Sequence, residues 1–104
     1  MSELIKLERD IEECRKLIST ADALEGLRKN RLFKTLIEEG YLNKEAVRNT
    51  LNLDYAHLRE GSIRALAGIS SFNAYLQTIE QAGEIARNTL VELLDEQTKM
   101  LAGE

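Results

Sequence analysis

The chain is poor in the residues that interrupt or cross-link a fold. It has no proline and no tryptophan, and Cys14 is the only cysteine among its 104 residues. The commonest helix breaker is therefore missing, and no disulfide can form within the chain, which is typical of a reducing compartment. Apolar runs last only a few residues, far short of the ~20 that a membrane-spanning helix needs. The N-terminus lacks a basic segment followed by an apolar run, so we expect no signal peptide and synthesis in a cytoplasm.

The residues that are present favour helix throughout. Leu, Ala, Glu, Lys and Arg dominate, and all are good helix formers. Hydrophobic residues make up 43% of the chain but aromatic residues only 5%, so the core must be mostly aliphatic. A chain of this length typically forms one domain. We therefore predict a single all-α domain, an elongated helical hairpin or bundle that spans residues 1–104.

Residues 1–29 predict an N-terminal helix, because apolar residues recur there at alternating spacings of three and four. Ser2 is the expected N-cap. Ser19 with Asp22 fits a capping box, so the helix either restarts there or runs on to about Lys29. The apolar stripe consists of Leu4, Leu7, Ile11, Cys14, Ile18 and Ala21.

Residues 30–53 predict a short central αα-hairpin. Asn30 is the expected cap of its first helix and Asn43 the cap of its second. Between them Gly40 is expected in the left-handed conformation that ends many helices. We take the exposed turn as a candidate partner contact, formed by Gly40, Tyr41 and Leu42. The apolar face of the second helix would consist of Ala46, Val47, Thr50 and Leu51.

Residues 62–101 predict one long helix that begins at Ser62, with Gly68 as the expected place for a kink or break. Its apolar residues follow a heptad pattern over most of this length, and such a seam must be covered by another helix. The N-terminal helix or a second subunit would serve, and the length of the seam favours an oligomer. The residues that we assign to the helix interface are Ile69, Phe72, Leu76, Ile79, Gly83, Ala86, Leu90 and Leu93.

The formal net charge of −4 is unevenly distributed. Residues 1–25 carry −3, residues 26–64 carry +3 and residues 65–104 carry −4. An acidic total disfavours a general nucleic-acid-binding protein, which needs a basic face. The basic middle nevertheless offers candidate nucleic-acid contacts beside the hairpin: Arg28, Lys29, Arg31, Lys34 and Arg48.

No motif indicates catalysis, a cofactor or a metal. His57 is the only histidine and has no cluster of ligands at a suitable spacing. Cys14 lies on the apolar stripe, where we expect a small buried side chain and not a reactive thiol. Phosphate loops, nucleophile elbows and zinc-protease motifs are absent from the sequence. We therefore expect a protein that is not an enzyme.

Two stretches carry a further pattern: LFKTLIEEGYLNKEAVRNTL (Leu32–Leu51) and SIRALAGISSFNAYLQTIEQAGEIA (Ser62–Ala86). The first combines Phe-Lys, Gly-Tyr and Ala-Val-Arg, and the second combines Tyr-Leu-x-Thr-Ile with a later Gly and Ala. This half of the chain resembles a family of small helical tailed-bacteriophage proteins. The resemblance implies a structural or assembly accessory protein of a virion, and the segment between the two stretches is shorter than in many members.

Together these patterns favour a bacteriophage protein that binds itself and a larger virion protein through helix–helix contacts. It would be made in the host cytoplasm, and the virion is a second location that this function allows. One alternative is a small DNA-binding regulator that uses the basic hairpin. Another is an inhibitor that sequesters a host factor or ligand. No membrane is expected among its partners.

Overall fold

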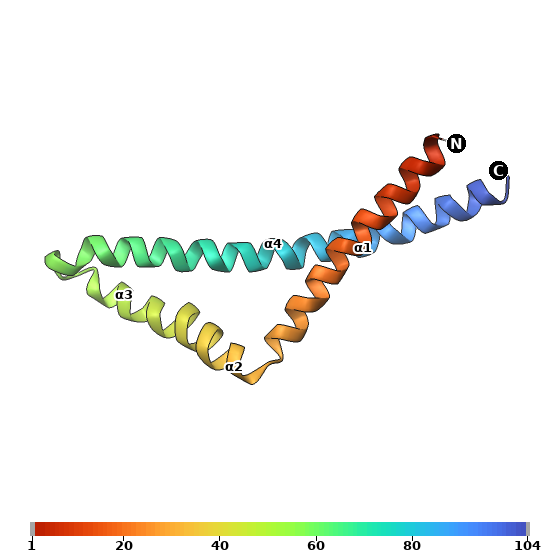
Figure 1. Cartoon of the computed structure of the whole chain (residues 1–104). Helices are drawn as coiled ribbons and strands as arrows, with labels where there is room; N and C mark the ends of the chain where they lie inside the picture. The colour runs from red at the N-terminus through yellow and green to blue at the C-terminus, as the bar shows by residue number, and fades with distance from the viewer. Residues whose placement is uncertain (1, 104) are drawn as a thin grey trace. The chain divides into compact units, whose positions relative to one another are not determined.

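The computed structural model describes residues 2–103, and the chain there is built of helices (Figure 1). In order they are α1 (Ser2–Arg28), α2 (Arg31–Phe33), the π-helix η1 (Lys34–Glu45), α3 (Ala46–Asn52) and α4 (Ala56–Leu101). The described residues contain no strand, which confirms the predicted all-α class. They form two compact units, a terminal unit of residues 2–24 with 78–103 and a central unit of residues 25–77.

Helix α1 is continuous for 27 residues, so the second of the two alternatives for the N-terminal helix is correct. It passes through Ser19 and Thr20 without a break, and the Thr20 hydroxyl donates to the Lys16 carbonyl of its own helix at 3.1 Å. The predicted stripe faces inward. Its buried members are Leu7, Ile11, Cys14 and Ala21, and Leu24 joins them one turn later.

In the terminal unit α1 packs closely against the C-terminal half of α4. A methyl group added at Gly83 would overlap the side chain of Ala21, and Ala86, one turn further along α4, is almost fully buried. An ion pair between Arg87 and Asp22 lies beside this contact. Small residues on both helices therefore let the two backbones approach each other.

The central hairpin predicted for residues 30–53 is wrong. Asn30 does cap the segment, since its side chain accepts hydrogen bonds from the backbone N–H groups of Leu32 (2.9 Å) and Phe33 (3.2 Å). The helix then continues through Gly40 and Asn43 as the 12-residue π-helix η1. Among residues 2–103 only Gly103 has a positive φ, so no left-handed turn forms at Gly40. The glycine is accommodated inside the helix, and the chain turns later, between α3 and α4.

Helix α4 begins at Ala56 and not at Ser62, where the sequence predicts its start. The Tyr55 carbonyl accepts hydrogen bonds from the backbone N–H groups of Leu58 and Arg59, both at 2.9 Å, and forms the first turn. The Arg59 Nε also donates to the Leu53 carbonyl at 2.8 Å, which ties the new helix to the preceding turn. Ser62 consequently lies buried within α4, and the helix runs through Gly68 without the expected break.

The core of the central unit lies between the N-terminal part of α4 and the segment α2–η1–α3. Ile69 and Leu76 of α4 are buried, as is Phe33 of α2. The Tyr41 ring of η1 meets the Phe72 ring of α4 edge to face, with centroids 5.9 Å apart. Spacing along α4 thus directs one stripe of side chains inward within this unit.

Candidate interaction surfaces

The predicted seam of α4 is shielded by the chain itself. Leu76 is only 4% exposed, and Ile69, Gly83 and Ala86 are also buried. The other four seam residues are half-buried: Phe72, Ile79, Leu90 and Leu93. In the terminal unit α1 lies against the seam at Gly83, and in the central unit η1 lies against it at Phe72. The chain itself thus covers most of the seam within each unit.

The predicted contact turn Gly40-Tyr41-Leu42 does not exist as a turn. All three residues belong to η1, and Gly40 and Leu42 are half-buried. Tyr41 is 37% exposed, and its hydroxyl oxygen lies 3.5 Å from the position of a Cβ at Gly68. With its ring on Phe72, Tyr41 joins η1 to α4 inside the central unit.

A shallow groove of about 390 Å³ lies between η1–α3 and α4 in the central unit. Leu42 and Ile69 supply apolar walls, and Ser70 and Asn73 supply hydrogen-bonding groups. The remaining lining residues are Ala46 and Leu66. The groove is open to solvent, and it contains no ionisable side chain that could act as an acid or base.

A second shallow groove, of about 400 Å³, lies in the terminal unit between the start of α1 and the end of α4. Its charged lining is mainly acidic, with Glu3, Asp10 and Glu96 against Lys6. Its apolar lining consists of Leu7, Leu93 and Met100. Such a mixture is ordinary for the edge of a helix pair, and nothing in it selects a particular ligand.

Carboxylates engage most of the candidate nucleic-acid contacts. Arg28 pairs with Glu38 at 2.9 Å, Lys29 with Glu25 at 3.5 Å, and Arg48 with Glu45 at 2.6 Å. Within residues 2–103 the other two, Arg31 and Lys34, form no ion pair, and both are exposed. Paired cations attract phosphate less strongly, because the nearby carboxylate cancels much of their field.

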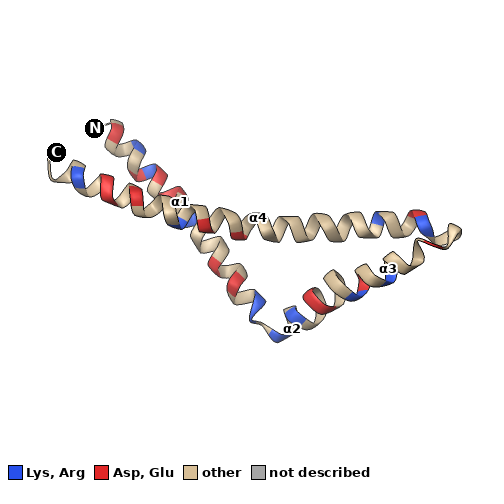
Figure 2. Ribbon diagram, turned by 180° about the vertical axis from the view of Figure 1, so that it is seen from behind, with Lys and Arg blue, Asp and Glu red and all other residues tan. Residues whose placement is uncertain are grey.

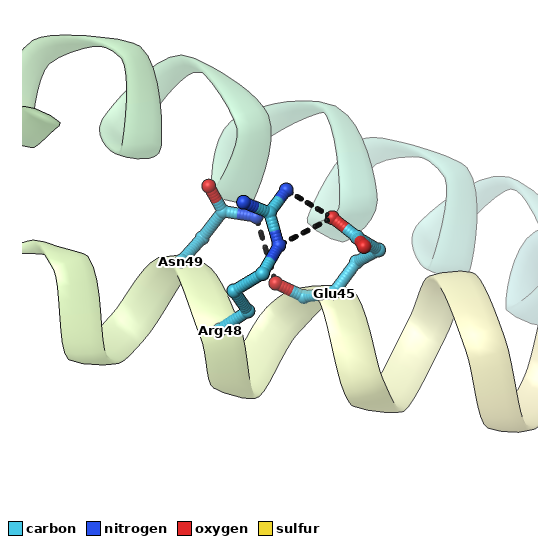
Figure 3. Close-up of polar contacts among 3 residues, drawn as sticks. All are labelled: Glu45, Arg48 and Asn49. Atoms are coloured by element: carbon cyan, nitrogen blue, oxygen red, sulfur yellow. Dashed lines mark hydrogen bonds and ion pairs between the residues drawn. The ribbon is translucent and has the colours of Figure 1, made fainter.

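Figure 3 shows the polar contacts where η1 passes into α3. Arg48 donates to one oxygen of the Glu45 carboxylate through Nη2 at 2.6 Å and Nε at 3.2 Å. This hydrogen bond holds the pKa of Glu45 below its ordinary value and raises the pKa of Arg48. The buried Asn49 side chain donates through Nδ2 to the Glu45 carbonyl at 2.7 Å. Glu45 thus accepts from both residues, one at its side chain and one at its backbone.

Sequence reasoning missed a surface on the outer side of α4. The 15 residues between Arg64 and Glu80 contain no ionisable acid or base except Tyr75, and the middle of α4 is tan in Figure 2. Within the central unit one side of this stretch packs inward, but the opposite side faces solvent. We call that side the uncharged face; it consists of Ala67, Ser71, Ala74 and Tyr75, all exposed, and the exposed Ile63 lies at one end of it, just before Arg64. The absence of charged residues between Arg64 and Glu80 was the signal in the sequence that could have revealed this face.

His57 and Cys14 line neither of the two grooves. His57 is exposed and its ring approaches the Tyr55 ring, with centroids 6.4 Å apart. Cys14 is a buried free thiol within the α1 stripe. Residues 2–103 contain no group of three or more His, Cys, Asp or Glu side chains placed to hold a metal ion.

In the same range no helix combines the length and the hydropathy required to cross a lipid bilayer. No protein-family model, curated protein sequence or solved structure matches the chain.

Proposed function

We propose that this chain is a non-enzymatic bacteriophage structural or assembly accessory protein that acts through helix–helix contacts with itself and with a larger virion protein. The phage assignment rests on the resemblance carried by Leu32–Leu51 and Ser62–Ala86. The mode of action rests on one observation, the uncharged face of α4. The seam is covered within the chain, so this face is the surface through which the chain would bind its partners.

The composition of the uncharged face supports this role. Solvent-facing sides of helices in soluble proteins normally carry charges, and the buried centres of interfaces are depleted in them. Ala67 and Ser71 are small enough to let a second helix approach closely, and Tyr75 is 62% exposed. Tyrosine is enriched at interfaces because its ring is apolar and its hydroxyl can remain hydrated. Ile63 adds an exposed aliphatic side chain at one end.

Sedimentation velocity over a range of concentrations tests the self-association. The double variant Ala67→Glu/Ser71→Lys places an i,i+4 ion pair on the face, in the order that favours the helix. It should leave the circular dichroism spectrum unchanged and weaken association at least ~10-fold, because the new charges would lose hydration in an interface. Val91→Lys is the matched control, since Val91 is an exposed apolar residue elsewhere on α4. A wild-type chain that stays monomeric, or a double variant that associates equally well, would refute the proposed contact.

A pull-down from infected cells tests the virion partner. Tagged wild-type chain should retain a virion protein, and the Ala67→Glu/Ser71→Lys variant should lose it while the Val91→Lys variant keeps it. Retention of a host enzyme instead would favour the inhibitor alternative. If all three chains retained the virion protein equally, the uncharged face would not be the surface that binds it.

A further inference from the structure

Several aliphatic side chains of α2, η1 and α3 face solvent in the central unit. Leu32 and Leu36, four residues apart, are the most exposed of them, at 69% and 65%. Val47 and Leu51 are exposed as well, and the buried residue of α3 is Asn49, so the apolar face predicted for this helix is wrong. Exposed apolar side chains that gather in one place often mark a contact with another molecule.

The surroundings of Leu32 and Leu36 are basic. Residues 26–37 contain four basic side chains and no acidic one. Two of the four, Arg31 and Lys34, are exposed and form no ion pair within residues 2–103. We call Arg31, Leu32, Lys34 and Leu36 the basic leucine patch. Apolar side chains beside charges are typical of a protein interface, and the charges favour a partner of opposite sign.

The terminal unit carries a surface of that opposite sign. Its groove, which we call the terminal groove, combines three apolar side chains with three carboxylates and one lysine. This lining alone selects no ligand, but it complements the basic leucine patch in both charge and polarity. The surrounding unit is acidic too, because residues 1–24 and 78–104 hold 12 acidic and 6 basic side chains. The chain therefore contains both members of a complementary pair of surfaces.

The patch and the groove of one chain cannot meet each other. Asp10 lines the groove, and the continuous helix α1 carries the chain from there to Arg28. At ~1.5 Å per residue this part of α1 is roughly 27 Å long. Helix α2 begins at Arg31, and the short connection before it spans at most about 11 Å, which is too little to return over that distance. A second copy of the chain is the partner that can fill the groove.

We propose that the basic leucine patch of one copy docks in the terminal groove of another copy. The leucines of the patch lie against the apolar lining of the groove, and its two cations lie beside the carboxylates. Because each copy has one patch and one groove, the contact is heterologous, and its repetition forms a ring or an open filament. The inference rests on the proposed function in that the chain binds itself, but it uses surfaces separate from the uncharged face.

Salt distinguishes this contact from one at the uncharged face. Exposed ion pairs contribute little to affinity, so burial of the two leucines supplies most of it, and the charges set orientation and association rate. Dissolved ions screen such charges within about 10 Å at 0.1 M ionic strength. Association through the patch should therefore weaken as salt is added, whereas contact between uncharged surfaces should not.

Reversal of the charges on the patch tests the contact by sedimentation velocity at low salt. All chains carry Ala67→Glu/Ser71→Lys, so that the uncharged face does not contribute, and we call this double variant the parent chain. The parent chain should associate, and the association should weaken as salt is added. Adding Arg31→Glu/Lys34→Glu should weaken the association at least ~10-fold, because the altered patch repels the carboxylates of the groove.

Reversal of the charges on the groove should have the same effect. Glu3 and Glu96 line the groove and are exposed, so Glu3→Lys/Glu96→Lys should also weaken association of the parent chain at least ~10-fold. Arg9→Glu/Arg15→Glu is the matched control for the altered patch. It changes the net charge by the same amount at two exposed residues that do not line the groove, and it should associate like the parent chain.

A mixture of the two reversed chains separates a specific contact from a general effect of charge. Each chain alone has like charges on its patch and its groove. In an equal mixture every patch finds a groove of opposite sign, so association should return to the level of the parent chain. Circular dichroism verifies that all chains remain helical.

Three results would overturn the proposed docking. They are a parent chain that stays monomeric at low salt, whether or not it binds duplex DNA there, a reversal that leaves association unchanged, and a mixture that stays monomeric. The uncharged face is judged by a different comparison, wild type against Ala67→Glu/Ser71→Lys. Failure of one proposal can therefore be told from failure of the other.

Discussion

Among single residues, Gly83 stabilises the packing of α1 against α4 because it has no side chain. It lies where α1 and α4 meet in the terminal unit, and a methyl group there would overlap Ala21. We expect Gly83→Ala to lower the free energy of unfolding by about 1–3 kcal/mol, because overpacking outweighs the better helix propensity of alanine. Urea denaturation followed by circular dichroism measures this. Gly26→Ala, where nothing lies within 4 Å, should instead raise stability by up to ~1 kcal/mol; equal responses would contradict the close contact.

The ion pair of Glu45 with Arg48 predicts a pH dependence. Because this contact lowers the pKa of Glu45 in the folded chain, its stabilising contribution is complete above the ordinary carboxyl pKa and is lost as the pH falls through the lowered value. Wild type should therefore exceed Glu45→Gln in stability near neutral pH, with a difference that disappears in acid. Both side chains are largely exposed, so the difference should be small and should shrink when salt is added. A difference that persists in acid would exclude this ion pair as its cause.

At the scale of elements, periodicity predicted four of the five buried residues of α1, and the predicted seam residues of α4 are all buried or half-buried. It failed for residues 30–53, where Gly40 has the signature of a helix end but lies inside η1. Local propensities do not encode a π-helix, because its geometry depends on packing such as Tyr41 against Phe72. The start of α4 was missed for a related reason. Its first turn is closed on the Tyr55 carbonyl and is tied to the Leu53 carbonyl by Arg59, and neither contact has a signature in the sequence.

Two neighbouring residues test which side of α4 faces the core of the central unit. Leu76 is buried in the central unit, and Tyr75, the residue before it, belongs to the uncharged face. Leu76→Ala should cost about 2–5 kcal/mol of unfolding free energy because it leaves a cavity. Tyr75→Ala should change it by no more than about 0.5 kcal/mol, which is usual for exposed positions. Thermal and urea denaturation of both variants at low protein concentration provide the comparison, and a larger loss for Tyr75→Ala would place the seam on the wrong side of α4.

At the scale of the whole molecule, charge separates the two units. Residues 1–24 and 78–104 carry 6 basic and 12 acidic side chains, whereas residues 25–77 carry 8 basic and 6 acidic ones. The candidate nucleic-acid contacts all lie in the second set, which is only weakly basic. Its structure shows why composition overstates that basic character. Arg28, Lys29 and Arg48 each lie beside a carboxylate of the same unit, so of the five candidate contacts only Arg31 and Lys34 remain outside ion pairs.

This distribution of charge predicts weak binding to DNA. Specific binding requires several phosphate contacts in addition to base contacts, and each phosphate neutralised steepens the dependence on salt. Of the five candidate nucleic-acid contacts, Arg31 and Lys34 are exposed and outside ion pairs. We therefore expect the chain to bind duplex DNA only at low salt, with an affinity that depends weakly on the salt concentration. Fluorescence anisotropy at two salt concentrations measures both quantities. Tight binding at physiological salt, with a steep slope that Arg31→Ala/Arg48→Ala reduces, would instead establish the DNA-binding alternative, because the ion pairs would then have to open on contact with phosphate.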